Sequence, residues 1–221
     1  MDMTVEQRAA RHAALGDPMR LRIVDELSSS DRAPVELRRR LGIESNLLAH
    51  HLDVLESVGL VIRSRSSGDG RRRYVHLVRA AHDTVGSVPR LAPRRALFVC
   101  TRNSARSQLA AALWRQLTHA PAASAGTDPA EQVDPGAVRA AARSGLDLGT
   151  AGPRKLASLP RLPELVITVC DRAHEELDPP PEWLHWSVAD PVAAGTTAAF
   201  DATVHELRRW IVAVADVKEQ P

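Results

Sequence analysis

The segment ALFVCTRNSARS, residues 96–107, is the most informative part of the second half of this chain. The run Arg95–Val99, apolar after its first residue, is typical of a short buried strand. An amphipathic helix is expected after the stretch, because apolar residues recur there at helical spacing: Leu109, Leu113, Trp114 and Leu117. A cysteine and an arginine separated by five residues, with a serine after the arginine, therefore lie between a predicted strand and a predicted helix.

The spacing from Cys100 to Arg106 suits the binding of a tetrahedral oxyanion. Five intervening residues can curl so that their amide N–H groups point inward at a helix N-terminus. In that positive field the pKa of Cys100 is expected to fall from ~8.5 toward neutrality, and Arg106 is expected to hold two oxygens of the anion. Ser107 can donate to the sulfur, and Asn103 can shape the loop because asparagine tolerates left-handed backbone. The predicted oxyanion-binding positions are Thr101, Arg102, Asn103, Ser104, Ala105 and Ser107.

A general acid for this chemistry is predicted at Asp190. Phosphoryl transfer from oxygen needs an acid to protonate the leaving group, and Asp190 follows the predicted strand Trp183–Trp186 with a stiffening proline after it. Structural interpretations of the same residues remain as alternatives to the catalytic ones. An Asp-Pro pair often only marks a turn, and Cys100 could be a packed core residue, since cysteine is among the most buried residue types.

The first half of the chain has the pattern of a small helical domain with a hairpin. Apolar stripes are predicted from Leu21, Ile23, Val24 and Leu27, from Val35, Leu37 and Leu41, and from Leu48, Leu52 and Leu55. The predicted helices are Val5–Leu15, one that begins at Pro18 after the N-cap Asp17, one from Pro34 that ends at Gly42, and Ser45–Val58. The segments Leu60–Ile62 and Tyr74–Leu77 are strand-like, and the segment between them contains Ser-Gly-Asp-Gly, which is typical of a hairpin turn.

Two short helices, a tight turn and a basic hairpin together follow the winged helix-turn-helix plan. The second helix of the pair would present its first residues to base edges in the major groove, and hairpin arginines would neutralise phosphates. The predicted DNA-contacting residues are Ser45, Asn46, Ala49, His50 and Asp53 on the helix, with Arg71, Arg72 and Arg73 on the hairpin. A helical packing module with a solvated, arginine-rich hairpin is the alternative.

Length and composition bound the remaining possibilities. The 221 residues are enough for two small domains, predicted at 1–79 and 95–221 with a linker at 80–94. The net charge of +2 makes no global case for nucleic-acid binding, although residues 1–79 hold 14 arginines against 11 acids. No apolar run reaches the ~20 residues of a membrane span, and the N-terminus lacks the pattern of a secretory signal. Two cysteines cannot build a disulfide framework, so a cytoplasmic location is expected.

Residues 6–77 resemble the ArsR-type family of repressors. The resemblance is carried by ALGDPMRLRIVDEL (14–27), LLAHHLDVLESVGLV (47–61) and GDGRRRYVHL (68–77). It implies a homodimer that binds a near-palindromic double-stranded DNA operator. The arsenic-sensing members carry a cysteine pair where this chain has the segment 31–35, so no thiolate metal site is expected. His12, His50 and His51 are expected to be packing or DNA-facing residues rather than metal ligands.

Residues 96–217 resemble the low-molecular-weight protein tyrosine phosphatases and, among them, the thioredoxin-type arsenate reductases. The motifs are FVCTRNSARSQLAAALW (98–114), VDPGAVRAAARSGLDLG (133–149), LVITVCDRA (165–173) and HWSVADPV (185–192). The resemblance implies Cys100 as nucleophile, Arg106 as oxyanion clamp, Asp190 as acid and Cys170 as a first resolving cysteine. For the whole chain the expected fold is then a mainly α winged helix-turn-helix domain followed by an α/β domain with a parallel four-stranded sheet.

Departures from the family pattern favour reduction over phosphatase activity. Ala105 replaces a second loop cysteine, Val192 replaces a tyrosine, and the one tyrosine, Tyr74, lies in the other domain. Leu177 stands at the second resolving position, so an external thiol such as thioredoxin or mycothiol is expected to complete the reaction, with no bound cofactor. Cys170 could equally be a core residue. A domain that only senses an oxyanion or the redox state, and a phosphatase, remain the alternatives.

Overall fold

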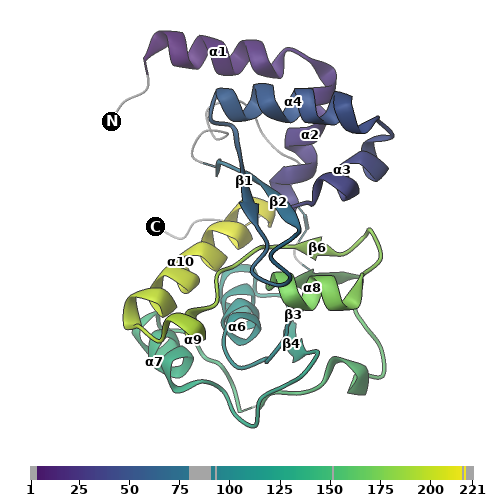
Figure 1. Cartoon of the computed structure of the whole chain (residues 1–221). Coiled ribbons are helices and arrows are strands. Elements are labelled where there is room, and N and C mark those ends of the chain that lie inside the picture. Colours follow the sequence, from purple (N-terminus) through teal and green to yellow (C-terminus); the bar gives the residue numbers. More distant parts are fainter. Residues whose placement is uncertain (1–3, 80–90, 93, 151, 216, 218–221) are drawn as a thin grey trace. The chain divides into compact units, whose positions relative to one another are not determined.

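A computed structural model describes residues 4–79, 91–92, 94–150, 152–215 and 217, which form two compact units (Figure 1). The first unit lies within residues 4–79, and the second is built mainly from Leu91 onward. Most of the predicted linker 80–94 lies outside the described residues. Leu91, near its end, donates a backbone hydrogen bond to Val214 (2.6 Å), so this residue packs with the second unit.

The first unit contains four helices and one antiparallel hairpin among its described residues. Its elements are α1 (Val5–Leu15), α2 (Pro18–Ser29), α3 (Pro34–Leu41), α4 (Ser45–Ser57), β1 (Val61–Arg65) and β2 (Arg73–Leu77). Local signals set their ends: the Asp17 carboxylate accepts from two amides of the first turn of α2, and Gly42 ends α3 with a positive φ of 66°.

The core of the first unit is formed by leucine-rich stripes that converge between these helices. Its buried residues include Ile23, Val24, Leu27, Leu37, Leu48, Leu52 and Leu55, as the periodicity predicts. The prediction was wrong for Leu21 and Val35, which are 47% and 42% exposed. Each lies two positions before a core residue of its own helix, a rotation of about 200°, which places it off the buried stripe.

The second unit is an α/β domain built on a parallel four-stranded sheet of order β4-β3-β5-β6, which confirms the predicted fold class. The strands are β3 (Ala96–Cys100), β4 (Ala122–Gly126), β5 (Leu165–Thr168) and β6 (Leu184–His185). The helices are α6 (Arg106–Thr118), α7 (Pro135–Arg143), the 3-10 turn η1 (Leu156–Ser158), α8 (Asp171–Leu177), α9 (Pro191–Ala194) and α10 (Thr197–Val214).

Alternation along β3 divides the core of this unit into two layers. Ala96, Phe98 and Cys100 face the larger cluster under α6, α7 and α10. Leu97 and Val99 face a smaller cluster that includes residues of η1 and α8. Since all four strands are parallel, their carboxyl ends meet at one edge, where the loop after Cys100 begins. No helix in the described part of the chain is long and apolar enough to span a bilayer.

Candidate functional site

The loop from Cys100 to Arg106 connects the end of β3 to the first residue of α6. The Asn103 amide N–H donates to the Cys100 sulfur (N···Sγ 3.2 Å), and the Ser107 hydroxyl lies 3.1 Å from the same sulfur. The Asn103 amide therefore points at the sulfur and Ser107 contacts it, while the binding of an oxyanion by the whole loop stays a prediction.

Asn103 holds the loop in shape with both its backbone and its side chain. Its φ is +48°, and its side-chain amide donates to Ser107 Oγ (2.8 Å) and accepts from the Arg154 amide N–H (2.9 Å). The Gln108 side chain donates to its carbonyl (3.1 Å). Asn103 is fully buried, so these bonds replace its water contacts and fix the curl of the loop.

Gly126 on β4 lets the neighbouring strand approach this loop. A Cβ there would lie 2.5 Å from the Thr101 carbonyl oxygen and 3.1 Å from the Asn103 nitrogen. The requirement is for space, not for an unusual φ. Gly126 is a contributor to the site that the motif search did not identify.

Arg106 and Asp190 are brought together although 84 residues separate them. Arg106 Nη2 donates to Asp190 Oδ2 (2.9 Å), and Nη1 donates to the Val188 carbonyl (3.1 Å). Asp190 also accepts from the Val192 amide as the N-cap of α9. The predicted acid thus lies beside the predicted clamp, and the two side chains neutralise each other.

Burial raises the pKa of the Cys100 thiol above its ordinary value, although the charge of Arg106 and the hydrogen bond from Ser107 oppose that change. The expectation that this pKa falls is therefore wrong for the structure as described. Cys100 is only 2% exposed, and the desolvation of a thiolate there outweighs the single guanidinium, which is already paired with Asp190.

Cys170 lies beside the loop, at the N-terminus of α8. Its sulfur is 3.3 Å from Thr101 Oγ1 and 3.4 Å from the Ala173 amide nitrogen, and it is 2% exposed. Both cysteines are free thiols. The thiol of Cys170 is thus in contact with Thr101, the residue that follows Cys100.

The remaining loop positions differ in their surroundings. Arg102 is 55% exposed at its side chain and forms an ion pair with Asp128, which the sequence analysis did not single out. Thr101, Ser104 and Ala105 are buried, and the Ser104 carbonyl accepts from the Asp134 amide (2.9 Å). Arg102 therefore lies at the solvent-exposed edge of the loop, whereas Thr101, Ser104 and Ala105 lie in its buried part.

A buried polar network behind α8 was also not predicted. His185 Nδ1 and His174 Nδ1 each lie 2.9 Å from Thr168 Oγ1, and His185 Nε2 lies 3.1 Å from Asp171 Oδ1. The pKa of Asp171 is held below its usual range. Burial by itself would raise this pKa, but the hydrogen bonds from His185 and Ser187 outweigh the effect of burial. Only the strand–helix geometry brings these residues together.

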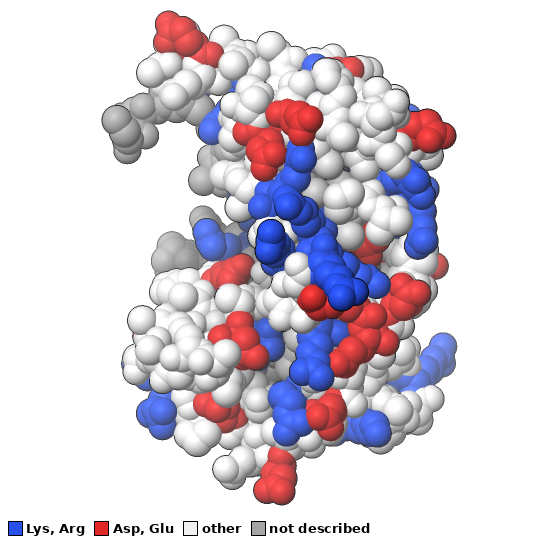
Figure 2. Space-filling view, viewed as in Figure 1, with Lys and Arg blue, Asp and Glu red and all other residues white. Residues whose placement is uncertain are grey.

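The residues predicted to contact DNA are exposed in the first unit. Ser45, Asn46, Ala49 and His50 are exposed on α4, and Arg71, Arg72 and Arg73 are exposed on the hairpin. Figure 2 shows Lys and Arg side chains gathered over the hairpin of β1 and β2. Two of the helix residues already have partners, because Arg38 donates to Ser45 Oγ (3.1 Å) and Asp53 is ion-paired with Arg63. The Asp53 carboxylate is thus already paired within the protein.

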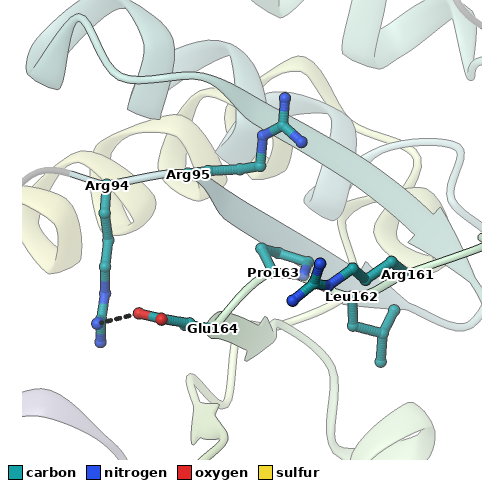
Figure 3. Close-up of a pocket in the computed structure, with 6 residues that line it drawn as sticks. All are labelled: Arg94, Arg95, Arg161, Leu162, Pro163 and Glu164. Carbon is teal, nitrogen blue, oxygen red and sulfur yellow. Dashed lines mark hydrogen bonds and ion pairs between the residues drawn. The ribbon is translucent and has the colours of Figure 1, made fainter.

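A shallow hollow of about 350 Å³ lies at the amino-terminal edge of the sheet, before β3 and β5 (Figure 3). It is lined by Arg94, Arg95, Arg161, Leu162, Pro163 and Glu164. Arg94 and Glu164 point toward each other and form an ion pair (3.0 Å). The hollow contains none of the predicted site residues. Within the described ranges, no three His, Cys, Asp or Glu side chains are placed to share a metal ion.

Residues 95–219 match the family model of the low molecular weight phosphotyrosine protein phosphatases. The chain belongs to this family. Residues 15–64 of this phosphatase-family chain match a helix-turn-helix domain model. The predicted combination of the two domain types is confirmed, whereas membership of the ArsR-type group stays a prediction.

The solved structures similar to this phosphatase-family chain include proteins named as arsenate reductases and proteins named as tyrosine phosphatases. An arsenate reductase in its phosphate-binding state is 22% identical, covering 57% of this chain and 99% of that one (TM-score 0.49). The arsenate reductase of Archaeoglobus fulgidus is 27% identical, covering 54% and 98% (TM-score 0.44). The tyrosine phosphatase Wzb of Escherichia coli K30, in complex with sulphate, is 23% identical, covering 52% and 92% (TM-score 0.48). No curated protein matches the chain.

Proposed function

We propose that the second unit is a thiol-dependent arsenate reductase and that the first unit is a DNA-binding transcription regulator. The observation that carries the reductase proposal is the place of Cys170, whose sulfur is 3.3 Å from Thr101, the neighbour of Cys100. A phosphatase needs one thiol, whereas a reductase needs a second thiol near the first.

In the first step Cys100 attacks the arsenic of a bound arsenate. An S–As bond forms as the thiol proton of Cys100 passes, by way of an arsenate oxygen, to the Asp190 carboxylate. Asp190 returns this proton to the arsenate oxygen that leaves as water. Arg106 and the loop amides hold the remaining oxygens. Since Asp190 and Arg106 are paired in the structure, the incoming anion displaces the carboxylate from the guanidinium, and the freed carboxylate then takes up and returns this proton.

In the second step the Cys170 thiolate attacks the Cys100 sulfur. An S–S bond forms, the S–As bond breaks, and its electron pair remains on arsenic, which leaves as arsenite. Arsenic is thereby reduced by two electrons and the two cysteines are oxidised to a disulfide. An external dithiol, or two molecules of a small thiol such as mycothiol, then reduces that disulfide, because Leu177 offers no third thiol.

The test is an arsenate reduction assay coupled to thioredoxin or to mycothiol. Wild type, Cys100→Ser and Cys170→Ser are compared, with Ser158→Ala on η1, whose hydroxyl donates to the Lys155 carbonyl, as a control outside the loop. The proposal expects activity in wild type and in the control, and loss in both cysteine variants. Loss in Cys100→Ser alone means that an external thiol resolves the adduct, and no activity in wild type overturns the proposal.

Phosphatase activity is the second candidate, and the family match over residues 95–219 favours it. Hydrolysis of an aryl phosphate that is lost in Cys100→Ser, depressed in Asp190→Asn and unchanged in Cys170→Ser would support it. Val192, which is 41% exposed beside Asp190, provides no aromatic surface for a phosphotyrosine ring.

The regulatory proposal rests on the helix-turn-helix match and on the exposed residues of α4 and the hairpin. From the family resemblance we further propose that the protein is a homodimer that binds a near-palindromic operator. Selection of DNA fragments with the full chain, followed by sedimentation of the free and bound protein, tests both parts. Binding that shows no preference between fragments, or a monomer on DNA, contradicts this proposal.

A further inference from the structure

Ser64, His76 and Asp31 form a hydrogen-bonded chain on the first unit, at the same hairpin that carries Arg73. Ser64 Oγ lies 2.6 Å from His76 Nε2, and His76 Nδ1 lies 3.0 Å from Asp31 Oδ1. Both distances are within the range that joins a nucleophile to its base and the base to an orienting carboxylate. We propose that Ser64 is a nucleophile that is acylated by activated carboxylic esters, with His76 as its base.

The direction of the hydrogen bonds follows from the chemistry of the three side chains. An ionised carboxylate only accepts hydrogen bonds, so the nitrogen of His76 that faces Asp31 carries the ring proton. The other nitrogen of the neutral ring is then an acceptor, and the Ser64 hydroxyl donates to it. This arrangement prepares the hydroxyl to lose its proton to the imidazole.

Backbone pairing explains why the three residues meet. Ser64 on β1 and His76 on β2 are diagonal neighbours, because Ser64 pairs with Tyr74 and His76 pairs with Ile62. Asp31 is brought to the same place by a short bridge, in which Arg32 and Val75 exchange backbone hydrogen bonds of 3.3 and 2.8 Å. The order along the chain is Asp, Ser, His, which a motif search does not recognise.

Partial exposure distinguishes this chain of residues from a fully buried network. The Asp31 side chain is 3% exposed, whereas the His76 side chain is 16% exposed and Ser64 is likewise only partly buried. Ile62 shares the face of Ser64 and is 53% exposed, so it offers apolar surface to an acyl or aryl group. The similar trio of Thr168, His185 and Asp171 in the second unit lacks this access, because its hydroxyl is fully buried.

The proposed step is a balanced acyl transfer. Ser64 Oγ forms a bond to the carbonyl carbon of the ester while the bond from that carbon to the leaving oxygen breaks. The hydroxyl proton passes to His76 Nε2 and then to the leaving alkoxide or phenoxide. Asp31 stabilises the imidazolium that exists between the two proton transfers.

The experiment treats the full chain with 4-nitrophenyl acetate and follows acetylation at each serine by peptide mass spectrometry. Ser57, an exposed serine of α4 whose hydroxyl donates to a carbonyl, is the internal control. Ser64 is expected to react at least about tenfold faster than Ser57, the low end of what general-base assistance provides. Equal rates at the two serines overturn the proposal, and this comparison needs no variant.

Two variants sharpen the result. Ser64→Ala should remove the fast acetylation event, and His76→Gln should slow it at Ser64 by about tenfold while leaving Ser57 unchanged. Circular dichroism checks the fold of each variant. A folded His76→Gln protein that acetylates Ser64 at the wild-type rate also overturns the proposal.

Discussion

The guanidinium of Arg106 donates a hydrogen bond to the carboxylate of Asp190, with Nη2 2.9 Å from Oδ2. The Arg106 side chain is 7% exposed and that of Asp190 is 40% exposed, so the pair spans the boundary between the loop and solvent. An oxyanion that binds Arg106 must compete with this carboxylate. The ion pair therefore sets both the affinity for the anion and the position of the proposed acid.

We predict that Asp190→Asn binds phosphate more tightly while it turns over more slowly. Loss of the competing charge should lower the Kd by about tenfold, the worth of one charged hydrogen bond, and loss of the acid should lower kcat by about 100-fold. Calorimetry with phosphate and the coupled assay measure the two effects. Asp201→Asn, which breaks only the surface pair with Arg143, is the matched control. Weaker phosphate binding in Asp190→Asn would contradict the competition.

The alkylation of Cys100 by iodoacetamide should accelerate steadily between about pH 7 and pH 10, since only the thiolate reacts. Burial raises the pKa of Cys100, so the thiolate fraction is small near neutrality and grows as the pH rises. Ser107→Ala removes a hydrogen bond that lowers this pKa and should move the profile to higher pH. Ser158→Ala should leave it in place. A rate that is already at its plateau at neutral pH is the outcome that excludes a raised pKa.

Gly126→Ala should lower activity by at least about tenfold, because the added methyl group collides with the Thr101 carbonyl and displaces the loop. Gly152→Ala is the control, since a Cβ there meets no atom within 4 Å. The coupled assay and thermal unfolding distinguish a displaced loop from a lost fold. Full activity in Gly126→Ala would show that the loop tolerates the displacement.

Asp171→Asn should destabilise the second unit by about 3 kcal/mol near neutral pH, because it leaves His185 buried without its charged partner. The pKa of Asp171 is lowered in the folded protein, so its contribution is present above the unfolded pKa and lost as the pH falls toward the folded one. The difference in unfolding free energy between wild type and variant should therefore shrink below about pH 4. Urea titrations at several pH values measure it, with Asp178→Asn as an exposed control. A difference that is independent of pH would mean that the carboxylate is not the cause.

Replacement of one hairpin arginine, Arg72→Ala, should weaken DNA binding on any sequence. The slope of log K against log salt should decrease by about 0.9 for each phosphate contact that is lost. Arg209→Ala, an exposed arginine of α10, should leave the slope unchanged. Fluorescence anisotropy over a range of salt concentrations gives both slopes, and equal slopes for Arg72→Ala and wild type argue against a phosphate contact at this residue.

The helices, the strands and the loop from Cys100 to Arg106 could be predicted from the sequence, because they depend on local signals. The caps at Asp17 and Gly42, the period of the apolar residues, and the spacing from Cys100 to Arg106 all act within a few residues of one another. Such short-range rules also predicted the parallel sheet, since strands and helices alternate from residue 96 onward.

The folded arrangement of the chain sets which distant residues meet and how these contacts change their chemistry. It paired Arg106 with Asp190, placed Cys170 beside Thr101, and joined Ser64 to His76 and Asp31. It also reversed the expected direction of the Cys100 pKa, because desolvation depends on how closely the rest of the chain packs around the sulfur. Contacts across tens of residues and burial are properties of the packed chain, so no local pattern encodes them.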